Sequence, residues 1–197
     1  MKRLAFAAVL MMSSATIVGC ASARLAQGPS ISSLSLRDNV PVVSVAMVKD
    51  ARGKTHAGTI GAAGISVPTS IKTTLHNYLV STIYDNFSVS VKTVGEGAVK
   101  PEDGTGKLVS SNLESVTMFS IDSIMQPVDT RCVLQLFVYD GAGQKVYEKA
   151  YSGFYQERIG MAWDTDGVVG NLVEDAIRDM MKQIAQDTEL KKLLENK

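Results

Sequence analysis

The chain has 197 residues, 45% of them hydrophobic, and its 20 basic and 20 acidic residues balance to a formal net charge of zero. A chain of this length can bury one substantial hydrophobic core. The balanced charge excludes the strongly basic surface that nucleic-acid binding requires, so we expect no nucleic acid among its partners.

The first residues have the pattern of a secretory signal. Lys2 and Arg3 precede an apolar or small stretch, residues 4–19, which is shorter than the about 20 residues of a membrane-spanning helix. The stretch ends in the letters IVGC, which resemble a bacterial lipobox, where the cysteine thiol receives diacylglycerol and the chain is cut just before it. We therefore expect cleavage between Gly19 and Cys20 and lipidation of Cys20, the alternative being an ordinary signal peptide with a chance cysteine.

Lipidation would make membrane lipid the first partner of the mature chain, because several acyl chains anchor a protein firmly. Residue 21 is Ala and not Asp, which in enterobacterial-type sorting favours the outer membrane. We thus expect an outer-membrane lipoprotein on the periplasmic face. Of the two cysteines, Cys132 would then remain without an internal disulfide partner, and its apolar surroundings predict a buried, inert thiol.

The chain divides into three parts. Residues 1–19 are the predicted lipoprotein signal peptide. Residues 20–39, rich in Ser and Ala and without a clear period, predict a lipidated N-terminus followed by a flexible tether. Residues 40–197 are expected to form a single periplasmic domain.

The first half of this domain mixes strand and helix patterns. Residues 40–50 are β-branched and apolar and predict a buried strand, whereas residues 51–66 hold four glycines and predict a long loop. Apolar residues four apart after Pro68 predict an amphipathic helix that ends near Asn86. Residues 87–94 alternate between apolar and polar and predict a second strand.

The second half has the pattern of a meander followed by a helix. A polar loop over 95–107 precedes predicted strands within 108–121, 131–140 and 144–156, and residues 165–197 carry an apolar stripe with helical period. The predicted order is β-α-β-β-β-β-α. This order favours an α+β fold in which two helices pack on one face of a sheet of four to five strands.

The sequence shows no recognisable catalytic pattern. His56 in the glycine-rich segment and His76 on a helix are the two histidines, and neither belongs to a cluster with metal-ligand spacing. The letters GTGK do not complete a phosphate-binding loop, and no G-x-S-x-G motif is present. Asp164 and Asp166 are favoured as helix N-cap residues over calcium ligands. We expect no enzyme, no cofactor and no metal.

Several segments together carry a family resemblance. They are the lipobox at Cys20, the stretch KDARGKTHAG with Asp50, Arg52 and Gly58, and the passage from YSGFYQ through Trp163 to the closing QDTELKKLL. On these residues the chain resembles the YajG-like family of bacterial outer-membrane lipoproteins. The resemblance implies an outer-membrane lipoprotein without known enzymatic activity. The order of the predicted elements is also similar to that of LptE and of auxiliary lipoproteins of transport systems, which support larger protein complexes of the cell envelope.

The expected function is therefore that of a non-enzymatic adaptor or accessory component of the cell envelope, with an envelope protein as partner. The candidate contact surface is the segment 51–66, with Asp50, Arg52 and His56 as possible contact residues. In the alternative interpretation, Asp50 caps backbone amides at a turn and Arg52 pairs with a neighbouring carboxylate.

A second functional hypothesis is a lipoprotein that binds a small ligand or a glycan. Tyr147, Tyr151 and Tyr155 recur every four residues on one predicted strand. They could form an aromatic platform between sheet and helix, although such a stripe can equally be packed sheet surface.

Overall fold

The computed structural model describes residues 20–32, 34–60, 63–101, 106–120, 127–158 and 165–196. In these ranges the chain forms an α+β domain with three helices and one sheet of nine strands. The predicted fold class is confirmed, but the sheet is larger than the four to five strands expected, and a third helix follows the two that were predicted. The predicted signal peptide, residues 1–19 with Gly19, lies outside the described residues, as do Trp163 and Asp164.

The strands are β1 (Cys20–Ser22), β2 (Val42–Ala46), β3 (Lys49–Asp50), β4 (His56–Ile60), β5 (Ala63–Ser66), β6 (Ser90–Val94), β7 (Lys107–Ser120), β8 (Pro127–Tyr139) and β9 (Lys145–Arg158). The helices are α1 (Ile71–Asn86), α2 (Thr165–Ala185) and α3 (Thr188–Glu195).

The long strand β7 organises the sheet. On one side, β8 and then β9 pair antiparallel with it in sequence, which confirms the predicted meander. On the other side, β2, β3 and β4 pair parallel with successive parts of β7. Strand β6 extends the sheet beyond β2, and β5 and β1 extend it beyond β4. The long strand β7 thus pairs with the short strands β2, β3 and β4 along one edge.

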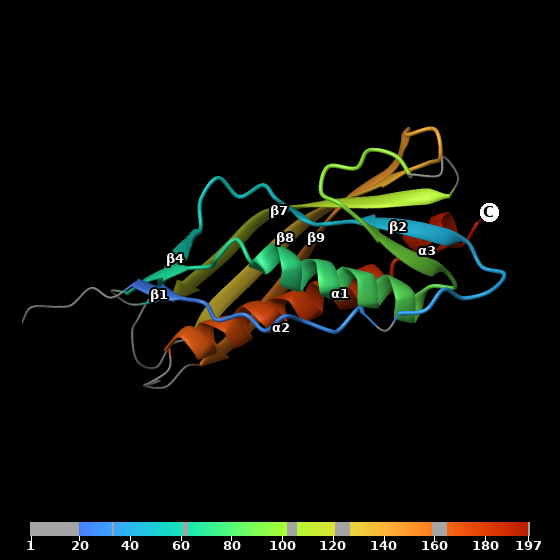
Figure 1. Ribbon diagram of the computed structural model, residues 1–197. Helices are drawn as coiled ribbons and strands as arrows, with labels where there is room; N and C mark the ends of the chain where they lie inside the picture. Colours follow the sequence, from blue (N-terminus) through green and yellow to red (C-terminus); the bar gives the residue numbers. More distant parts are fainter. Residues whose placement is uncertain are drawn as a thin grey trace, which may run out of the picture.

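Helices α1 and α2 pack side by side over one face of the sheet (Figure 1). Alternate residues of β8 point into this layer and are buried, among them Cys132 and Leu134. Burial raises the pKa of the Cys132 thiol to about 12, so it stays protonated, as expected for an inert core cysteine. Gly153 of β9 lies directly under α2, since a Cβ there would be 1.8 Å from the carbonyl oxygen of Ala176.

The segment 51–66 is not the long loop that its glycines predicted. Residues 56–60 and 63–66 form the strands β4 and β5, and β4 pairs with the end of β7. At Gly58, φ is +143° and a Cβ would lie 2.0 Å from the Met118 carbonyl oxygen. Only glycine fits there, so this residue permits close strand approach rather than a flexible loop.

The outer edge of β9 pairs with no other strand in the described ranges. Side chains of α2 cover part of it instead. The Phe154 N–H donates to Asp179 Oδ2 at 3.1 Å, and Gln183 Nε2 donates to the Ser152 carbonyl at 2.9 Å. These bonds occupy backbone groups that a further strand would need.

Candidate functional site

Cys20, the predicted lipidation residue, stands at the first position of β1. Its backbone lies opposite Gly64 of β5, and Ala21 and Ser22 continue the parallel ladder. The Ser22 N–H donates to Asp166 Oδ1 at 3.0 Å, so an aspartate expected to cap α2 also holds β1. The chain therefore enters the sheet at the very residue where the mature protein is expected to begin.

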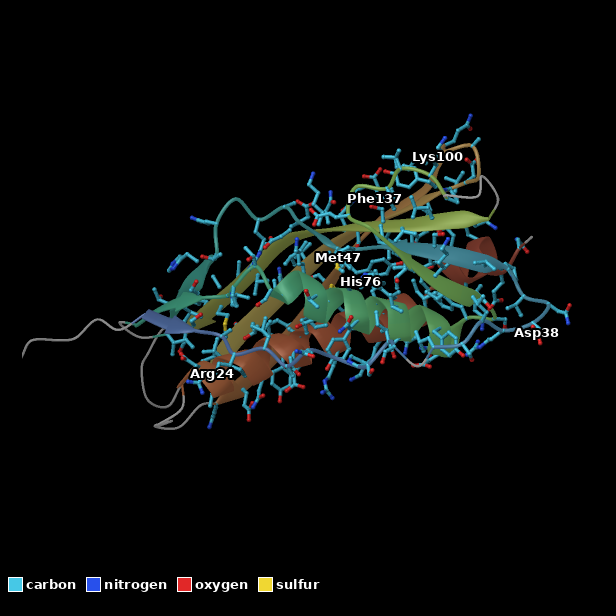
Figure 2. The ribbon with its side chains drawn as sticks, viewed as in Figure 1. Arg24, Asp38, Met47, His76, Lys100 and Phe137 are labelled. Carbon is cyan, nitrogen blue, oxygen red and sulfur yellow. The ribbon has the colours of Figure 1, made fainter. Side chains whose placement is uncertain are left out.

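Residues 20–39, called the strap from here on, were expected to form a flexible tether. They lie instead along α1 and α2, from Arg24 at one end of the molecule to Asp38 at the other (Figure 2). The Ala26 N–H donates to Glu174 Oε1 of α2 at 2.6 Å, and Thr74 Oγ1 of α1 donates to the Ala26 carbonyl at 2.7 Å. The strap thus joins the two helices.

The remaining strap contacts show that α2 is shaped to receive it. The Arg24 N–H donates to the Asp166 carbonyl at 3.0 Å. A Cβ at Gly170 would lie only 1.9 Å from the Arg24 carbonyl oxygen, so the lack of a side chain there makes room for the strap. At the far end, the Arg37 guanidinium lies over the Tyr84 ring, 4.0 Å from its centroid. The sequence of the strap has no hydrophobic period and did not predict these contacts, because the partner residues lie on helices that are distant in the sequence.

The candidate contact residues Asp50 and Arg52 face each other in a partly buried pair. Arg52 Nε and Nη2 each donate to one carboxylate oxygen of Asp50 at 2.8 Å, and the side chains are only 6% and 14% exposed. Nη1 and Nη2 also reach the carbonyls of Val67 and Pro68, at 3.2 and 3.3 Å. The hydrogen bonds and positive charge of Arg52 lower the pKa of Asp50 against the effect of burial.

This pair therefore joins the turn after β3 to the start of α1. The Arg52 N–H also donates to Asp50 Oδ1 at 3.2 Å, so the alternative interpretation, a capped turn with a local ion pair, is confirmed. The two side chains are thus engaged with each other, and Arg52 also lines the surface pocket that contains Lys54 and His56.

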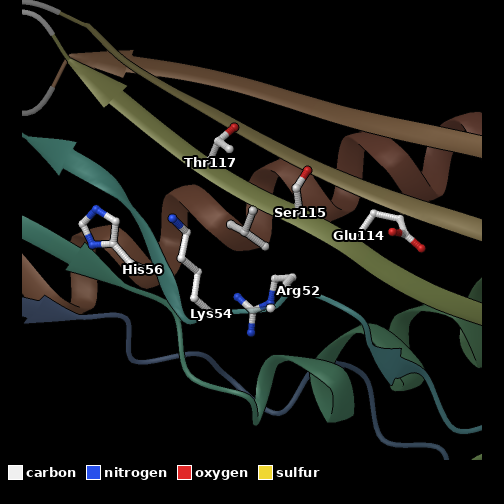
Figure 3. A pocket seen from close by; sticks show the side chains of 8 residues that line it. Arg52, Lys54, His56, Glu114, Ser115 and Thr117 are labelled. Carbon is white, nitrogen blue, oxygen red and sulfur yellow. The ribbon is translucent and has the colours of Figure 1, made fainter.

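His56 remains an exposed member of the predicted contact surface. It opens β4 beside Lys54, and both line a shallow pocket of about 190 Å³. Figure 3 shows the opposite wall, which β7 supplies through Glu114, Ser115 and Thr117. The pocket combines cationic and anionic side chains at its rim. Its open form and mixed charge fit a protein contact better than the enclosed capture of a small molecule.

His76 is a core residue of α1. Its side chain is buried, and burial lowers its pKa even though a hydrogen bond with the Ala46 backbone favours the charged form. Nδ1 has no hydrogen-bond partner among the described residues. A neutral imidazole packed between α1 and β2 is therefore the form that this environment favours.

A buried cluster that the sequence did not predict links β9 to the junction of α2 and α3. The hydroxyls of Tyr147 and Tyr151 are 2.8 Å apart and lie 3.0 and 2.9 Å from Asp187 Oδ2. Lys149 Nζ pairs with the same oxygen, while Asp187 Oδ1 accepts the Leu190 N–H at 2.9 Å and caps α3. The four-residue spacing of the tyrosines could be seen in the sequence, but their shared hydrogen-bond acceptor, Asp187, could not.

The cluster removes two of the three tyrosines from the predicted aromatic platform and leaves Tyr155 partly exposed. Tyr147 and Tyr151 point into the core and are 7% and 3% exposed, so they cannot offer their rings to a ligand. Burial and the neighbouring carboxylate raise the pKa of Tyr151. At Asp187 burial favours the neutral acid, but the hydrogen bonds from Leu190, Lys149 and the tyrosines outweigh it and lower the pKa.

No group of three or more His, Cys, Asp or Glu side chains among the described residues is placed to hold a metal ion. None of the helices α1–α3 is long and apolar enough to cross a membrane.

Comparison with known proteins gives a fold relationship. No family model matches the chain, and no curated protein matches it. A Xanthomonas campestris protein of family DUF330 superposes with a TM-score of 0.50 at 9% identity, over 88% of this chain and 93% of that one.

Two other solved structures are looser matches. PelC of Paraburkholderia phytofirmans, a dodecamer, has a TM-score of 0.47 at 10% identity, over 83% of this chain and 94% of that one. A minor lipoprotein of Acinetobacter baumannii has a TM-score of 0.46 at 12% identity, over 80% of this chain and 97% of that one. The chain thus shares the α+β fold of the Xanthomonas DUF330 protein, and this likeness concerns the fold alone.

Proposed function

We propose that the chain is an envelope lipoprotein, anchored by acylated Cys20 in the outer membrane and facing the periplasm. The observation that carries the proposal is the sequence around the anchor: a basic start, a short apolar stretch and the lipobox letters IVGC. The pairing of Cys20 with Gly64 in the sheet supports it, since an acyl group on Cys20 would be attached directly to the folded domain. We further propose that the chain is related to the YajG-like lipoproteins.

The anchor is tested by expressing the full chain and a Cys20→Ser variant in a bacterial host supplied with an alkyne analogue of palmitate. Wild type should take up the analogue, carry an acylated N-terminal Cys20 by mass spectrometry, and fractionate with the outer membrane. Cys20→Ser should lose the label and the membrane association. Unmodified Cys20 in the mature wild-type chain would refute the lipoprotein proposal, and fractionation with the inner membrane would refute the sorting part.

We propose that the anchored domain works without catalysis, as an accessory protein that contacts an envelope protein. The contact region that the structure supports is the rim of the shallow pocket, where Lys54 and His56 are exposed while Asp50 and Arg52 are occupied with each other. An open rim that carries side chains of both charges is typical of weak or transient protein contacts.

The contact is tested by crosslinking in intact envelopes. A His56→Ala, Lys54→Ala double variant should lose a crosslinked partner that wild type captures, with unchanged folding and membrane association. Lys100→Ala is the matched control, because Lys100 is an exposed lysine outside the pocket. Equal capture by the double variant and wild type would show that this rim is not the contact.

A further inference from the structure

Several strands begin or finish at one end of the domain, which is called the anchor end from here on. Strand β4 finishes there at Ile60 beside Ser120, the last residue of β7. Because β5 is antiparallel to β4, and β1 is parallel to β5, Cys20 starts at this same end. Strand β8 begins there at Pro127, opposite Arg158, where β9 finishes. Figure 1 shows β1 and β4 together at this end.

No flexible linker separates Cys20 from the folded domain. A free tether would add up to about 3.5 Å of reach per residue, but the ladder with β5 begins at Cys20 itself. The next residues stay attached, since the Ala23 N–H donates to the Ser66 carbonyl at 2.9 Å and Arg24 is held at Asp166 and Gly170. An acyl chain on Cys20 would therefore bring the anchor end to the lipid surface.

The side chains at the anchor end suit a phospholipid interface. Phe119, beside Thr59 near the end of β7, is 58% exposed. The Arg24 side chain is 74% exposed, with its Nε 4.0 Å from Asp166 Oδ2, and Arg158 is also exposed. An exposed aromatic ring fits the headgroup boundary, and guanidinium groups bind phosphate oxygens. Leu36 is 69% exposed but belongs to the far end of the strap, so position relative to Cys20, rather than exposure, singles out Phe119.

On the basis of the proposed lipid anchor, we infer that the bilayer surface is itself a binding partner of the domain. The anchor end rests on phospholipid, with Phe119 at the interface and Arg24 and Arg158 at headgroup phosphates. The strap keeps the domain from swinging, so it has one fixed orientation on the membrane. Lys54 and His56 then face a partner from a defined side.

The orientation is tested with full-length lipidated protein in vesicles of phosphatidylethanolamine and phosphatidylglycerol. An environment-sensitive fluorophore is attached at position 119 in a Phe119→Cys variant or at position 36 in a Leu36→Cys variant; buried Cys132 stays unlabelled. Nitroxide-bearing lipids should quench the label at 119 several-fold more than the label at 36. Equal quenching at the two positions would overturn the inference.

A strap-release variant provides the second test. Gly170→Ala would place a methyl group against the Arg24 carbonyl and push the strap off α2. It should reduce the difference in quenching between positions 119 and 36, while Gly95→Ala, which meets no atom within 4 Å, should preserve it. An unreactive Cys132 shows that the core of each variant is intact. An unchanged difference in Gly170→Ala would refute the role of the strap.

The two proposals fail in different ways. Vesicle flotation and the mass of the N-terminal peptide report whether Cys20 is acylated, before any quenching is measured. A chain without acyl groups would refute the lipoprotein proposal. A chain that carries lipid and floats with the vesicles, yet shows equal quenching at both positions, would refute the fixed orientation alone.

Discussion

Two ionic groups, the partly buried Asp50–Arg52 pair and the cluster around Asp187, differ in how far apart their members lie in the sequence. Asp50 and Arg52 are two residues apart and close a turn. Asp187 instead gathers side chains from β9, about 40 residues before it, and caps α3 at the same time. The first group closes a turn and ties it to the residues just before α1, whereas the second joins β9 to the junction of α2 and α3. Global stability should therefore depend more on the second.

Asp187→Ala is expected to have the largest effect. The substitution removes the cap of α3 and leaves two tyrosine hydroxyls in the core without their shared acceptor. We expect a loss of about 3 kcal/mol in the free energy of unfolding, measured by urea denaturation. Asp38→Ala, at an exposed strap residue, is the control and should change stability by less than about 0.5 kcal/mol. Equal losses in the two variants would contradict the importance of the cluster.

Arg52→Met should have a smaller effect, about 2 kcal/mol. It keeps much of the apolar stem but leaves the Asp50 carboxylate without its bidentate partner and removes the bonds to two carbonyls. The same denaturation experiment measures it, with Lys54→Met at an exposed neighbour as the control. If Arg52→Met cost more than Asp187→Ala, the proposed ranking of local and long-range groups would be reversed.

Acid should weaken both groups. The folded-state pKa of Asp50 and of Asp187 lies below the unfolded value. Each carboxylate therefore contributes stability that is fully present above about pH 5 and is lost as the pH falls through about 3.9 toward the folded pKa. The stability difference between wild type and Asp187→Ala should narrow over this window. A difference that stays constant from pH 7 to pH 3 would show that ionised Asp187 is not what stabilises the cluster.

Lys149→Met should have the smallest effect, less than about 1 kcal/mol. Half of the Lys149 side chain is exposed, so solvent screens its attraction to Asp187, and the tyrosines still bond the carboxylate. Thermal unfolding at low and high salt measures it, and the difference from wild type should shrink with salt. A loss as large as that of Asp187→Ala would mean that the ion pair, and not the tyrosine hydroxyls, dominates the cluster.

The sequence predicted what local periodicity determines. Helices α1 and α2 and the three-strand meander follow from apolar repeats of about 3.6 and of 2 residues, and the Asp50–Arg52 pair follows from a turn with neighbouring opposite charges. The burial of Cys132 was equally visible, because its whole strand is apolar.

The sequence did not predict features that depend on distant contacts. Gly58 lies in a segment predicted as a loop and Gly170 in a predicted helix, yet each allows a backbone carbonyl to approach closely. The strap has no period because its bonds go to side chains of α1 and α2. The break before α3 depends on Asp187, which serves both as a cap and as the acceptor for tyrosines of β9. Such contacts become visible only when the elements are placed in space.

The covered edge of β9 has a consequence for many copies on one membrane. Molecules tied to a surface in one orientation diffuse in two dimensions, at the same height, so their equivalent strands meet far more often than in free solution. An open strand edge would then promote sheet-to-sheet polymerisation. If the proposed anchor holds many copies on one membrane, the bonds of Asp179 and Gln183 to the backbone at Phe154 and Ser152 would oppose sheet-to-sheet pairing at this part of β9.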